Sequence, residues 1–478
     1  MLRAAPFLAA ALLALPAAGT PPAKQAAGHA KKAPCDLVVV AGAALPMDAA
    51  FTVRGATAVA IRGGEIVALG DPATIDAAYL PKQRIARPGG VLLPGFVNTH
   101  THAAMNLLRG LSNDQPLMDW LQKFIFPAEA KNVSPEFVRA GTDLACLEMI
   151  RGGTTTFADM YYYESDVASS VEKAGLRGVL GETWIDFPVP GHANLAETKV
   201  VTRAFLEKWK GHPRITAAIA PHAPYTCSRE TLQAARALAD EYGAPLLTHV
   251  SETRDEQKQI FEKYGKSSTA WLDEIGFLGP RLLVAHGVWL TPDDLKLLVE
   301  RHVSLSHNPE SNMKLGSGIA PVVAAREAGV VVALGTDGVA GSNNDLDMFD
   351  AMDFAGKLAK VSALDPTPLP APELLRMATI DGAKALGLDR LVGSLEPGKR
   401  ADLIVVELEN THVQPVFDLP STIVYASRGG DVSLSVVDGK ILWDGKSVLT
   451  LDEAKVLAAA KEWRGKILKS LEKSGEKK

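Results

Sequence analysis

Cysteine and surplus positive charge are both scarce in this sequence, and each scarcity excludes a class of protein. The 478-residue chain holds three cysteines, Cys35, Cys146 and Cys227, which are scattered and odd in number, so they form neither a disulfide framework nor a CxxC metal site. We expect ordinary buried thiols. Lys and Arg total 50 against 55 Asp and Glu, so there is no basic surplus to attract nucleic acid or an anionic membrane surface.

Long apolar runs are also lacking near the start of the chain. The run at residues 4–15 follows Arg3 and is too short to span a bilayer. Because small residues follow it, residues 1–19 resemble a signal peptide, and we expect a protein that is exported to the periplasm or secreted. Residues 20–35, rich in Pro, Ala, Gly and Lys, indicate a linker.

Apolar material is abundant overall. The composition, 47% hydrophobic and 22% charged, is typical of a soluble globular chain and excludes disorder and a collagen-like structure. The length allows roughly three domains of about 150 residues each, or an α/β barrel of 250 residues or more as one unit.

Two β-rich stretches, residues 36–93 and 391–450, flank the long middle of the chain. The Gly63-Gly64 pair between β-branched runs predicts a hairpin. We expect one small β-sandwich domain built from both chain ends, followed at 451–478 by a solvated Lys/Glu-rich helix with a frayed tail. The strand-like runs lie at residues 36–42, 57–62, 65–70, 401–407, 422–427 and 432–442.

The middle, residues 94–390, alternates short apolar runs with helical stretches of ten or more residues. This pattern is typical of βα units around a parallel sheet. Eight strands over this span fit an α/β fold of the (β/α)8 TIM barrel type, with a doubly wound open sheet as the alternative. The predicted strands are 96–100, 154–160, 177–184, 215–220, 245–250, 282–286, 303–306 and 330–336.

Polar residues gather where these strands end, which is the edge at which barrel enzymes carry their chemistry. His100 and His102 end the first strand, and because side chains two residues apart in a strand share a face, both imidazoles point to one place. A lone histidine there is more often packing, but His249, His286 and Asp337 end three further strands. The joint pattern matches the ligands of zinc or another divalent transition metal, with room for a water.

Two further residues near these strand ends are candidates for chemistry. The fourth strand, which runs into His222, holds no lysine of the kind that bridges two metals in sites of this architecture, so a single metal is favoured. His222 is then a substrate contact or a capped loop histidine. Glu252, three residues beyond His249, is a proton donor beside the metal water or a solvated loop carboxylate.

Several stretches together resemble the metal-dependent amidohydrolase superfamily, in particular its mononuclear aminohydrolase branch. The first group is Pro94–His102, His249–Glu252, His286-Gly and Gly335–Gly338. The second group is most similar to the 5′-methylthioadenosine/S-adenosylhomocysteine deaminases, and comprises Leu107–Gly110, Trp120-Leu, Pro127–Glu129, Pro221–Ser228, Ser306–Leu315 and Ser342–Phe349.

This resemblance implies a ligand set and a reaction. It implies that His100, His102, His249 and Asp337 bind one Zn²⁺ per subunit, with Fe²⁺ or Mn²⁺ as alternatives. It further implies a homo-oligomer that acts on a small-molecule substrate. The reaction is hydrolytic deamination of a purine nucleoside at C6, with Glu252, His286 and Asp337 as catalytic groups. The implied substrate contacts are Trp120, Glu129 for the ribose hydroxyls, His222 and Glu252 for the purine, and Ser342.

The sequence departs from the family pattern at two places, both concerned with substrate. Family members that accept the long homocysteine tail supply two arginines near the positions of Glu182 and Thr198, and one additional residue precedes Ser342. Related branches deaminate guanine or pterins, or hydrolyse s-triazines, so another N-heterocycle is an alternative substrate. Glu252 favours an amine leaving group and Glu129 favours a nucleoside, whereas a catalytically silent binding protein would need no Glu252 beside an open metal position.

Overall fold

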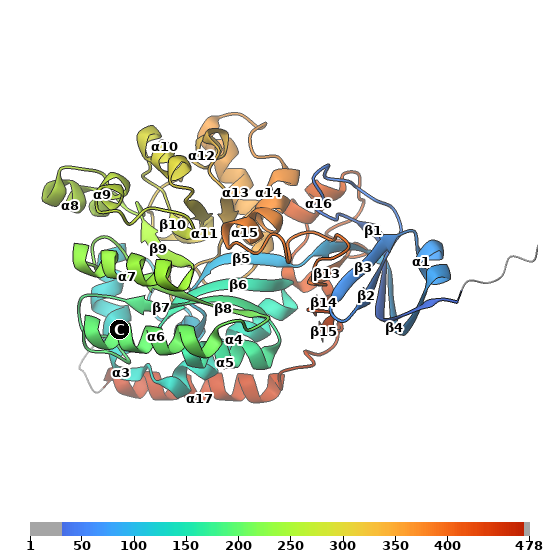
Figure 1. Cartoon of the computed structure of the whole chain (residues 1–478), viewed down its shortest axis with the longest axis horizontal. Helices are drawn as coiled ribbons and strands as arrows, with labels where there is room; N and C mark the ends of the chain where they lie inside the picture. Colours follow the sequence, from blue (N-terminus) through green and yellow to red (C-terminus); the bar gives the residue numbers. More distant parts are fainter. Residues whose placement is uncertain (1–30, 473–478) are drawn as a thin grey trace, which may run out of the picture.

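The computed structural model describes residues 31–472 and consists of a barrel and a smaller β domain beside it (Figure 1). The predicted signal peptide, residues 20–30 of the predicted linker and residues 473–478 lie outside the described residues. Within residues 31–472, no helix is both long enough and apolar enough to cross a bilayer.

Eight strands form one parallel sheet in chain order, which confirms the predicted (β/α)8 barrel. The first and last strands approach each other: the backbone N–H of Asp337 donates to the carbonyl oxygen of His100 (2.9 Å), and Asn98 Nδ2 donates to Thr336 Oγ1 (2.7 Å). An open sheet has no such junction. The strands are β5 (Phe96–Thr101), β6 (Thr154–Tyr161), β7 (Arg177–Trp184), β8 (Ile215–Pro221), β9 (Leu246–Val250), β10 (Leu282–His286), β11 (Ser304–His307) and β12 (Val332–Leu334).

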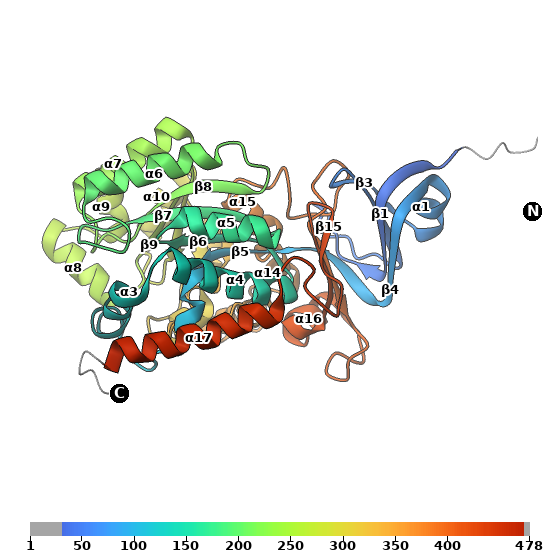
Figure 2. The ribbon, with the colours of Figure 1, turned by 90° about the horizontal axis from the view of Figure 1, so that it is seen from below.

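Helices cover the outside of the barrel, as Figures 1 and 2 show. Many begin at a polar N-cap: the side chains of Ser134, Asn194, Ser228 and Thr253 each accept a backbone N–H of the first helical turn. The covering helices include α4 (Pro135–Arg151), α5 (Glu164–Ala174), α6 (Leu195–Trp209), α7 (Arg229–Tyr242), α8 (Arg254–Tyr264), α9 (Ser268–Glu274), α10 (Pro292–Glu300), α11 (Pro309–Lys314), α12 (Val322–Ala328), α13 (Met348–Ala363), α14 (Ala371–Met377) and α15 (Ile380–Ala385).

The smaller domain contains strands from both chain ends, as predicted. Its seven strands form one sheet in the order β15-β14-β13-β4-β1-β2-β3, antiparallel except for the parallel pair β1 and β4. Apolar side chains from both ends, such as Val39 and Leu403, share one core. The elements are β1 (Ala33–Ala44), β2 (Thr57–Arg62), β3 (Glu65–Gly70), α1 (Pro72–Ala78), β4 (Tyr79–Pro94), β13 (Leu403–Glu407), β14 (Val432–Val437) and β15 (Lys440–Trp443).

Two predictions for this domain are wrong in detail. The predicted linker runs three residues too far, because β1 begins at Ala33, which pairs with Tyr79 of β4. The strand predicted at 422–427 is largely helical, in α16 (Leu419–Tyr425). Asp418 caps that helix and its Ile423 and Val424 are buried, so capping and packing override the β preference of the sequence.

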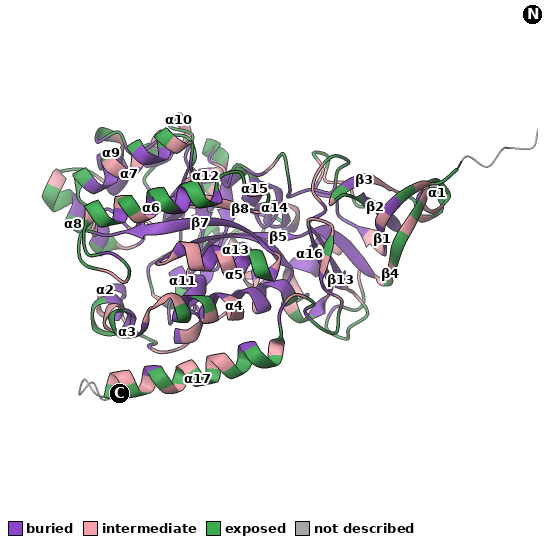
Figure 3. Ribbon diagram, turned by 60° about the horizontal axis from the view of Figure 1, so that its bottom comes forward, coloured by how far each residue is buried: buried purple, intermediate pink, exposed green. Residues whose placement is uncertain are grey.

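The C-terminal helix α17 (Glu453–Glu472) is less solvated than predicted. Figure 3 shows exposed residues along much of it, but Val456 and Ile467 are buried, and the ring of Trp463 meets that of Phe137 on α4 edge to face, with centroids 5.3 Å apart. The helix therefore packs against the barrel by one face. The three cysteines are free and buried, as expected.

Candidate active site

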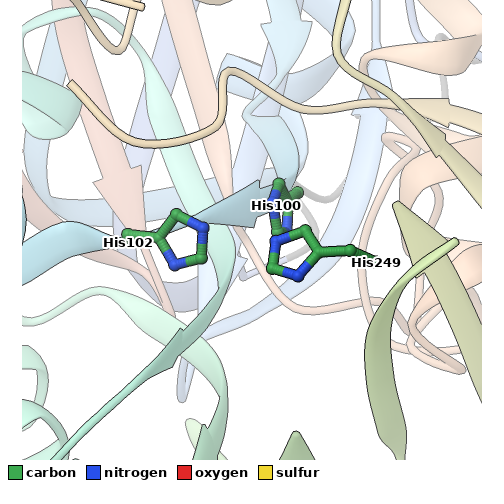
Figure 4. A group of neighbouring side chains, drawn as sticks. All are labelled: His100, His102 and His249. Atoms are coloured by element: carbon green, nitrogen blue, oxygen red, sulfur yellow. The ribbon is translucent and has the colours of Figure 1, made fainter. Parts of the chain in front are cut away.

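Three histidines form the centre of the site at the carboxyl end of the barrel strands. His100 and His102 lie at the end of β5, where their spacing of two places both rings on one side. His249 lies on β9, and its ring centroid is 4.9 Å from that of His100 and 5.4 Å from that of His102. Figure 4 shows the three imidazoles gathered in one place.

Backbone carbonyls fix the orientation of two of these rings. His102 Nδ1 donates to the carbonyl oxygen of Met160 (2.7 Å), and His249 Nδ1 donates to the carbonyl oxygen of His222 (2.7 Å). A histidine whose Nδ1 carries the proton for such a bond presents an unprotonated Nε2 as a metal ligand. The second nitrogens of His102 and His249 are thus available for a shared ligand.

Asp337 supplies an oxygen to the same centre. Its Oδ1 lies 3.3 Å from Nε2 of His100 and 3.3 Å from Nε2 of His102. Donor atoms at the corners of a tetrahedron around zinc, each about 2.0–2.1 Å from the ion, would be ~3.3 Å apart. The backbone of Asp337 has a φ of 68°, a left-handed conformation that non-glycine residues rarely adopt and that recurs at functional sites.

The pKa values of two of these histidines suit a divalent metal, whereas the contact with Asp337 outweighs burial and raises the pKa of His102 to about 9, so a metal that binds there must displace a proton from that ring. Burial lowers the pKa of His100 to about 4 and that of His249 well below its ordinary value, so both rings are neutral. Burial acts against ionisation of Asp337, but the contacts with His100 and His102 hold its pKa well below the ordinary value. His100 Nε2 is buried without a hydrogen-bond partner, as expected for an atom that is reserved for a metal.

His286 lies beside this centre, at the end of β10. Its Nδ1 donates to Oδ1 of Asn312 (2.9 Å), which turns Nε2 toward the site. There Nε2 is 3.9 Å from Oε2 of Glu252 and 4.0 Å from Oδ2 of Asp337. Like Asp337, His286 has a left-handed backbone, with φ 73°. The ring is therefore placed between two carboxylates that the sequence analysis selected.

Glu252 is buried, so it is not a solvated loop carboxylate. Burial raises its pKa to about 7, which is the range that suits proton transfer at neutral pH. Glu256 holds the backbone that carries it, because Oε1 and Oε2 of Glu256 accept the N–H groups of Ser251 (2.7 Å) and Glu252 (2.8 Å).

A cavity opens next to this cluster, with about 570 Å³ of space free of protein atoms, part of it open to solvent. All four of the remaining predicted substrate contacts line it: Trp120, Glu129, His222 and Ser342. Trp120 belongs to the π-helical turn η2 (Trp120–Ile125), which lies between α2 (Leu117–Asp119) and α3 (Phe126–Asn132). π-helical turns are rare in proteins overall, and those that occur are often found at functional sites.

Each of these four side chains is held by a neighbour. Trp120 Nε1 donates to the carbonyl oxygen of Ala340 (3.1 Å), and the hydroxyl of Tyr161 donates to Glu129 Oε1 (2.6 Å). The remaining bonds join His222 Nδ1 to Thr226 Oγ1 (2.9 Å) and Ser342 Oγ to the carbonyl oxygen of Gly338 (2.8 Å). Burial raises the pKa of Glu129 to about 7 and lowers that of His222 to about 3. The cavity thus offers a fixed carboxyl and a neutral imidazole to a bound molecule.

Glu182 and Thr198, the two positions where the family pattern has arginines, lie outside the cavity lining. Glu182 is buried and accepts the N–H groups of Tyr163 (3.2 Å) and Glu164 (2.9 Å). Thr198 Oγ1 bonds to Nδ1 of His192 (2.9 Å). Glu182 therefore holds the connection between β6 and α5, and Thr198 supports the loop after β7.

Four supporting residues were missed by the sequence analysis. Asp159 Oδ1 accepts hydrogen bonds from the hydroxyl of Thr101 (2.7 Å) and the backbone N–H of Ala103 (2.7 Å). It therefore holds the residues on both sides of His102. Ser311 Oγ donates to Asp337 Oδ2 (2.6 Å). Ser311 and Asn312 lie within the family-like stretch Ser306–Leu315, which pointed to this region without giving them roles. Nothing in the sequence marked Asp159 or Glu256.

Comparisons with known proteins define the class. Residues 91–442 match the model of the Amidohydrolase family, and this chain belongs to that family. Among relatives, a Syntrophobacter fumaroxidans protein named 5-methylthioadenosine/S-adenosylhomocysteine deaminase is 47% identical over 422 residues, which cover 88% of this chain and 96% of the relative.

Two further similar proteins are also named as deaminases of adenosine-type nucleosides. A Methanosarcina acetivorans protein named 5′-deoxyadenosine deaminase is 46% identical over 431 residues, 89% of this chain and 97% of the relative. The crystal structure of an adenosine deaminase from Xanthomonas campestris with bound zinc has a TM-score of 0.90 and 40% identity, and the match covers 92% of this chain and all of that one.

Proposed function

We propose that this protein catalyses the hydrolytic deamination of an adenosine-type nucleoside at C6, with release of ammonia. The observation that carries the proposal is Glu252, a buried carboxyl with a pKa raised to about 7, which faces His286 beside His100, His102, His249 and Asp337. A proton donor next to a metal site is what the departure of an amine requires.

The metal that these residues suit best is one Zn²⁺ per subunit, held by His100, His102, His249 and Asp337. The nitrogen and oxygen donors fit zinc, with Fe²⁺ and Mn²⁺ as alternatives. Zinc is also bound in the Xanthomonas campestris adenosine deaminase structure. When bound, such an ion lowers the pKa of water and makes it nucleophilic at neutral pH.

The protein side chains divide the proton transfers among them. Asp337 accepts the proton of the attacking water, and His286 orients the water oxygen toward C6 of the purine. Glu252 donates its proton to the ring nitrogen next to C6 as the C–O bond forms. Asp337 then passes its proton to the amino group, which leaves as ammonia when the C–N bond breaks, and the hydroxyl on C6 returns its proton to Glu252 as the carbonyl forms.

The substrate assignment rests on the cavity and on the names of the relatives. Those relatives are named for 5′-methylthioadenosine, S-adenosylhomocysteine, 5′-deoxyadenosine and adenosine, which share one base and one sugar. All the residues proposed as substrate contacts line the cavity. In the proposed complex, His222 and Glu252 contact the purine, Trp120 and Ser342 lie along the walls, and Glu129, which accepts a bond from Tyr161, binds the ribose hydroxyls. Guanine, pterins and s-triazines lack that sugar, so they are the weaker candidates.

A panel assay tests this function. Purified protein with a measured metal content is incubated with adenosine, 5′-methylthioadenosine, S-adenosylhomocysteine, guanine and melamine, and released ammonia is quantified. We expect ammonia from at least one nucleoside and none from guanine or melamine. Ammonia from guanine or melamine alone would replace the nucleoside assignment, and a metal-loaded protein inactive on all five would contradict that assignment and favour hydrolysis of another ring or amide.

Two further proposals concern where and in what state the protein works. We propose that the protein is exported, because Arg3 is followed by the apolar run at residues 4–15. N-terminal sequencing of protein from the periplasm or the medium tests this proposal. An intact N-terminus on protein from the cytosol would contradict it. We propose a homo-oligomer on the basis of the family resemblance, which light scattering of the purified protein tests.

A further inference from the structure

The cavity beside the metal cluster is separated from a second, outer cavity by a thin wall. The outer cavity has about 1090 Å³ of space free of protein atoms and lies between α3, the loop after β7, the loop after β8 and α8. Three residues line both cavities: Leu121, Phe126 and Tyr225. We call these three residues the partition.

The partition is built from two separate parts of the chain. Leu121 lies in the π-helical turn η2, Phe126 begins α3, and Tyr225 follows β8. Leu121 is buried, and the ring of Phe126 meets that of Phe187 edge to face at 5.4 Å on the outer side. Tyr225 packs at a right angle to His222 on the inner side, with ring centroids 5.9 Å apart.

The partition lies where the 5′ end of a nucleoside would be, an argument that rests on the proposed function. The purine C6 must be at the histidine cluster and the ribose hydroxyls at Glu129. Because C6 and the 5′ carbon are at opposite ends of a nucleoside, the 5′ substituent then points away from the metal cluster. Phe126 precedes Glu129 by three residues on α3, so the two side chains are neighbours on one helix face, and the partition adjoins the carboxyl proposed for the ribose.

Much of the inner cavity wall is apolar. Met105, Leu117 and Ile125 line the inner cavity together with Leu121 and Phe126, and none of the described residues that line it is Lys or Arg. A charged group pressed against such a wall loses its hydration without gaining a partner, which disfavours its binding. A hydrogen or a methylthio group at the 5′ carbon has no charge whose hydration is lost at this wall, and it gains apolar contact.

We propose that Phe126, together with Leu121 and Tyr225, is a specificity determinant that restricts the enzyme to adenosine-type nucleosides with a short, uncharged 5′ substituent. A long substituent must cross the partition into the outer cavity, where Gln122, Asp186, Gln259 and Lys263 supply polar surroundings. The ring of Phe126 closes that route. Removing the ring joins the two cavities.

The test is the ratio of kcat/KM for S-adenosylhomocysteine to that for 5′-deoxyadenosine, measured for the wild type and for variants. We expect the wild-type ratio to be below one tenth, Phe126→Ala to raise it at least tenfold, and Leu121→Ala to raise it less. The matched control is Phe124→Ala, because Phe124 lies in the same helical turn, is 38% exposed and lines neither cavity. This control should leave the ratio unchanged.

The possible outcomes separate the two proposals. A wild type that deaminates 5′-deoxyadenosine but has the same ratio as Phe126→Ala would overturn the partition and leave the proposed function standing. An equal rise in Phe124→Ala would also overturn it. A wild type that deaminates no nucleoside would overturn the proposed function, and the partition with it. If Phe126→Ala fails to fold, Phe126→Leu replaces it, with an expected rise of about threefold.

Discussion

The backbone N–H of Asp337 donates to the carbonyl oxygen of His100 across 2.9 Å, so the barrel closes through two residues of the metal cluster. The same pair is joined a second time, because Asp337 Oδ1 is 3.3 Å from His100 Nε2. The closure of the fold and the geometry of the proposed metal site are therefore coupled, and a change in one should be measurable in the other.

Removal of the metal should destabilise the protein as well as inactivate it. A ligand that binds the folded state alone stabilises it by about 2.7 kcal/mol when present at 100 times its dissociation constant. We expect treatment with 1,10-phenanthroline to lower the thermal unfolding midpoint, and added Zn²⁺ to restore both midpoint and activity. The variant His249→Ala should show no response to chelator. A midpoint that stays constant while the metal is lost would contradict the coupling.

Loss of the Asp159 carboxylate should weaken metal binding without touching a ligand. Asp159 holds Thr101 and Ala103 on either side of His102, and supporting partners of this kind typically contribute 10- to 100-fold to metal affinity. We expect Asp159→Ala to reduce zinc affinity by about that factor in a chelator competition assay. Asp159→Asn keeps an acceptor oxygen and should lose less. The control is Asp143→Ala, because Asp143 pairs with Lys173 of α5 and not with the β5 loop. Equal affinity in all variants would contradict this role.

The buried Glu129 should make stability depend on pH. Its pKa is about 7 in the folded state, against an ordinary value of 4.5. Between these values the unfolded chain releases a proton that the folded chain retains, so the free energy of unfolding falls as pH rises from about 4.5 to 7. Relative to wild type, the free energy of unfolding of Glu129→Gln should rise by about 2.5 kcal/mol between pH 5 and pH 8 in urea unfolding. Exposed Glu262→Gln is the control, and parallel pH profiles for wild type and Glu129→Gln would contradict the effect.

Glu252 should control the pH dependence of turnover. If its protonated form donates to the ring, kcat/KM should be level below pH 7 and fall about tenfold for each pH unit above it, because its pKa is about 7. Glu252→Gln should lose about 10²- to 10⁴-fold in kcat and lack this limb, while it retains its metal. An unchanged kcat in that variant would remove Glu252 from the mechanism, and Glu262→Gln should behave as wild type.

Local patterns in the sequence predicted much of this structure. The eight strands were visible because each is a short apolar run, and the spacing of His100 and His102 placed both rings on one face. The helix at Leu419–Tyr425 was not visible, because its β-branched residues favour a strand until the packing of Ile423 and Val424 is known. The contact of His286 with Asn312 and the meeting of Phe126 with Tyr225 at one wall join distant segments, so they require the tertiary structure.

The most direct test of the central claim is deamination of adenosine and 5′-deoxyadenosine in water enriched in ¹⁸O, with the product analysed by mass spectrometry and ammonia quantified in parallel. Hydrolysis at C6 predicts one ¹⁸O atom in the base of each product molecule and one ammonia released per product. Ammonia without label in the base, or a product that has lost its sugar and kept its amino group, would contradict the account.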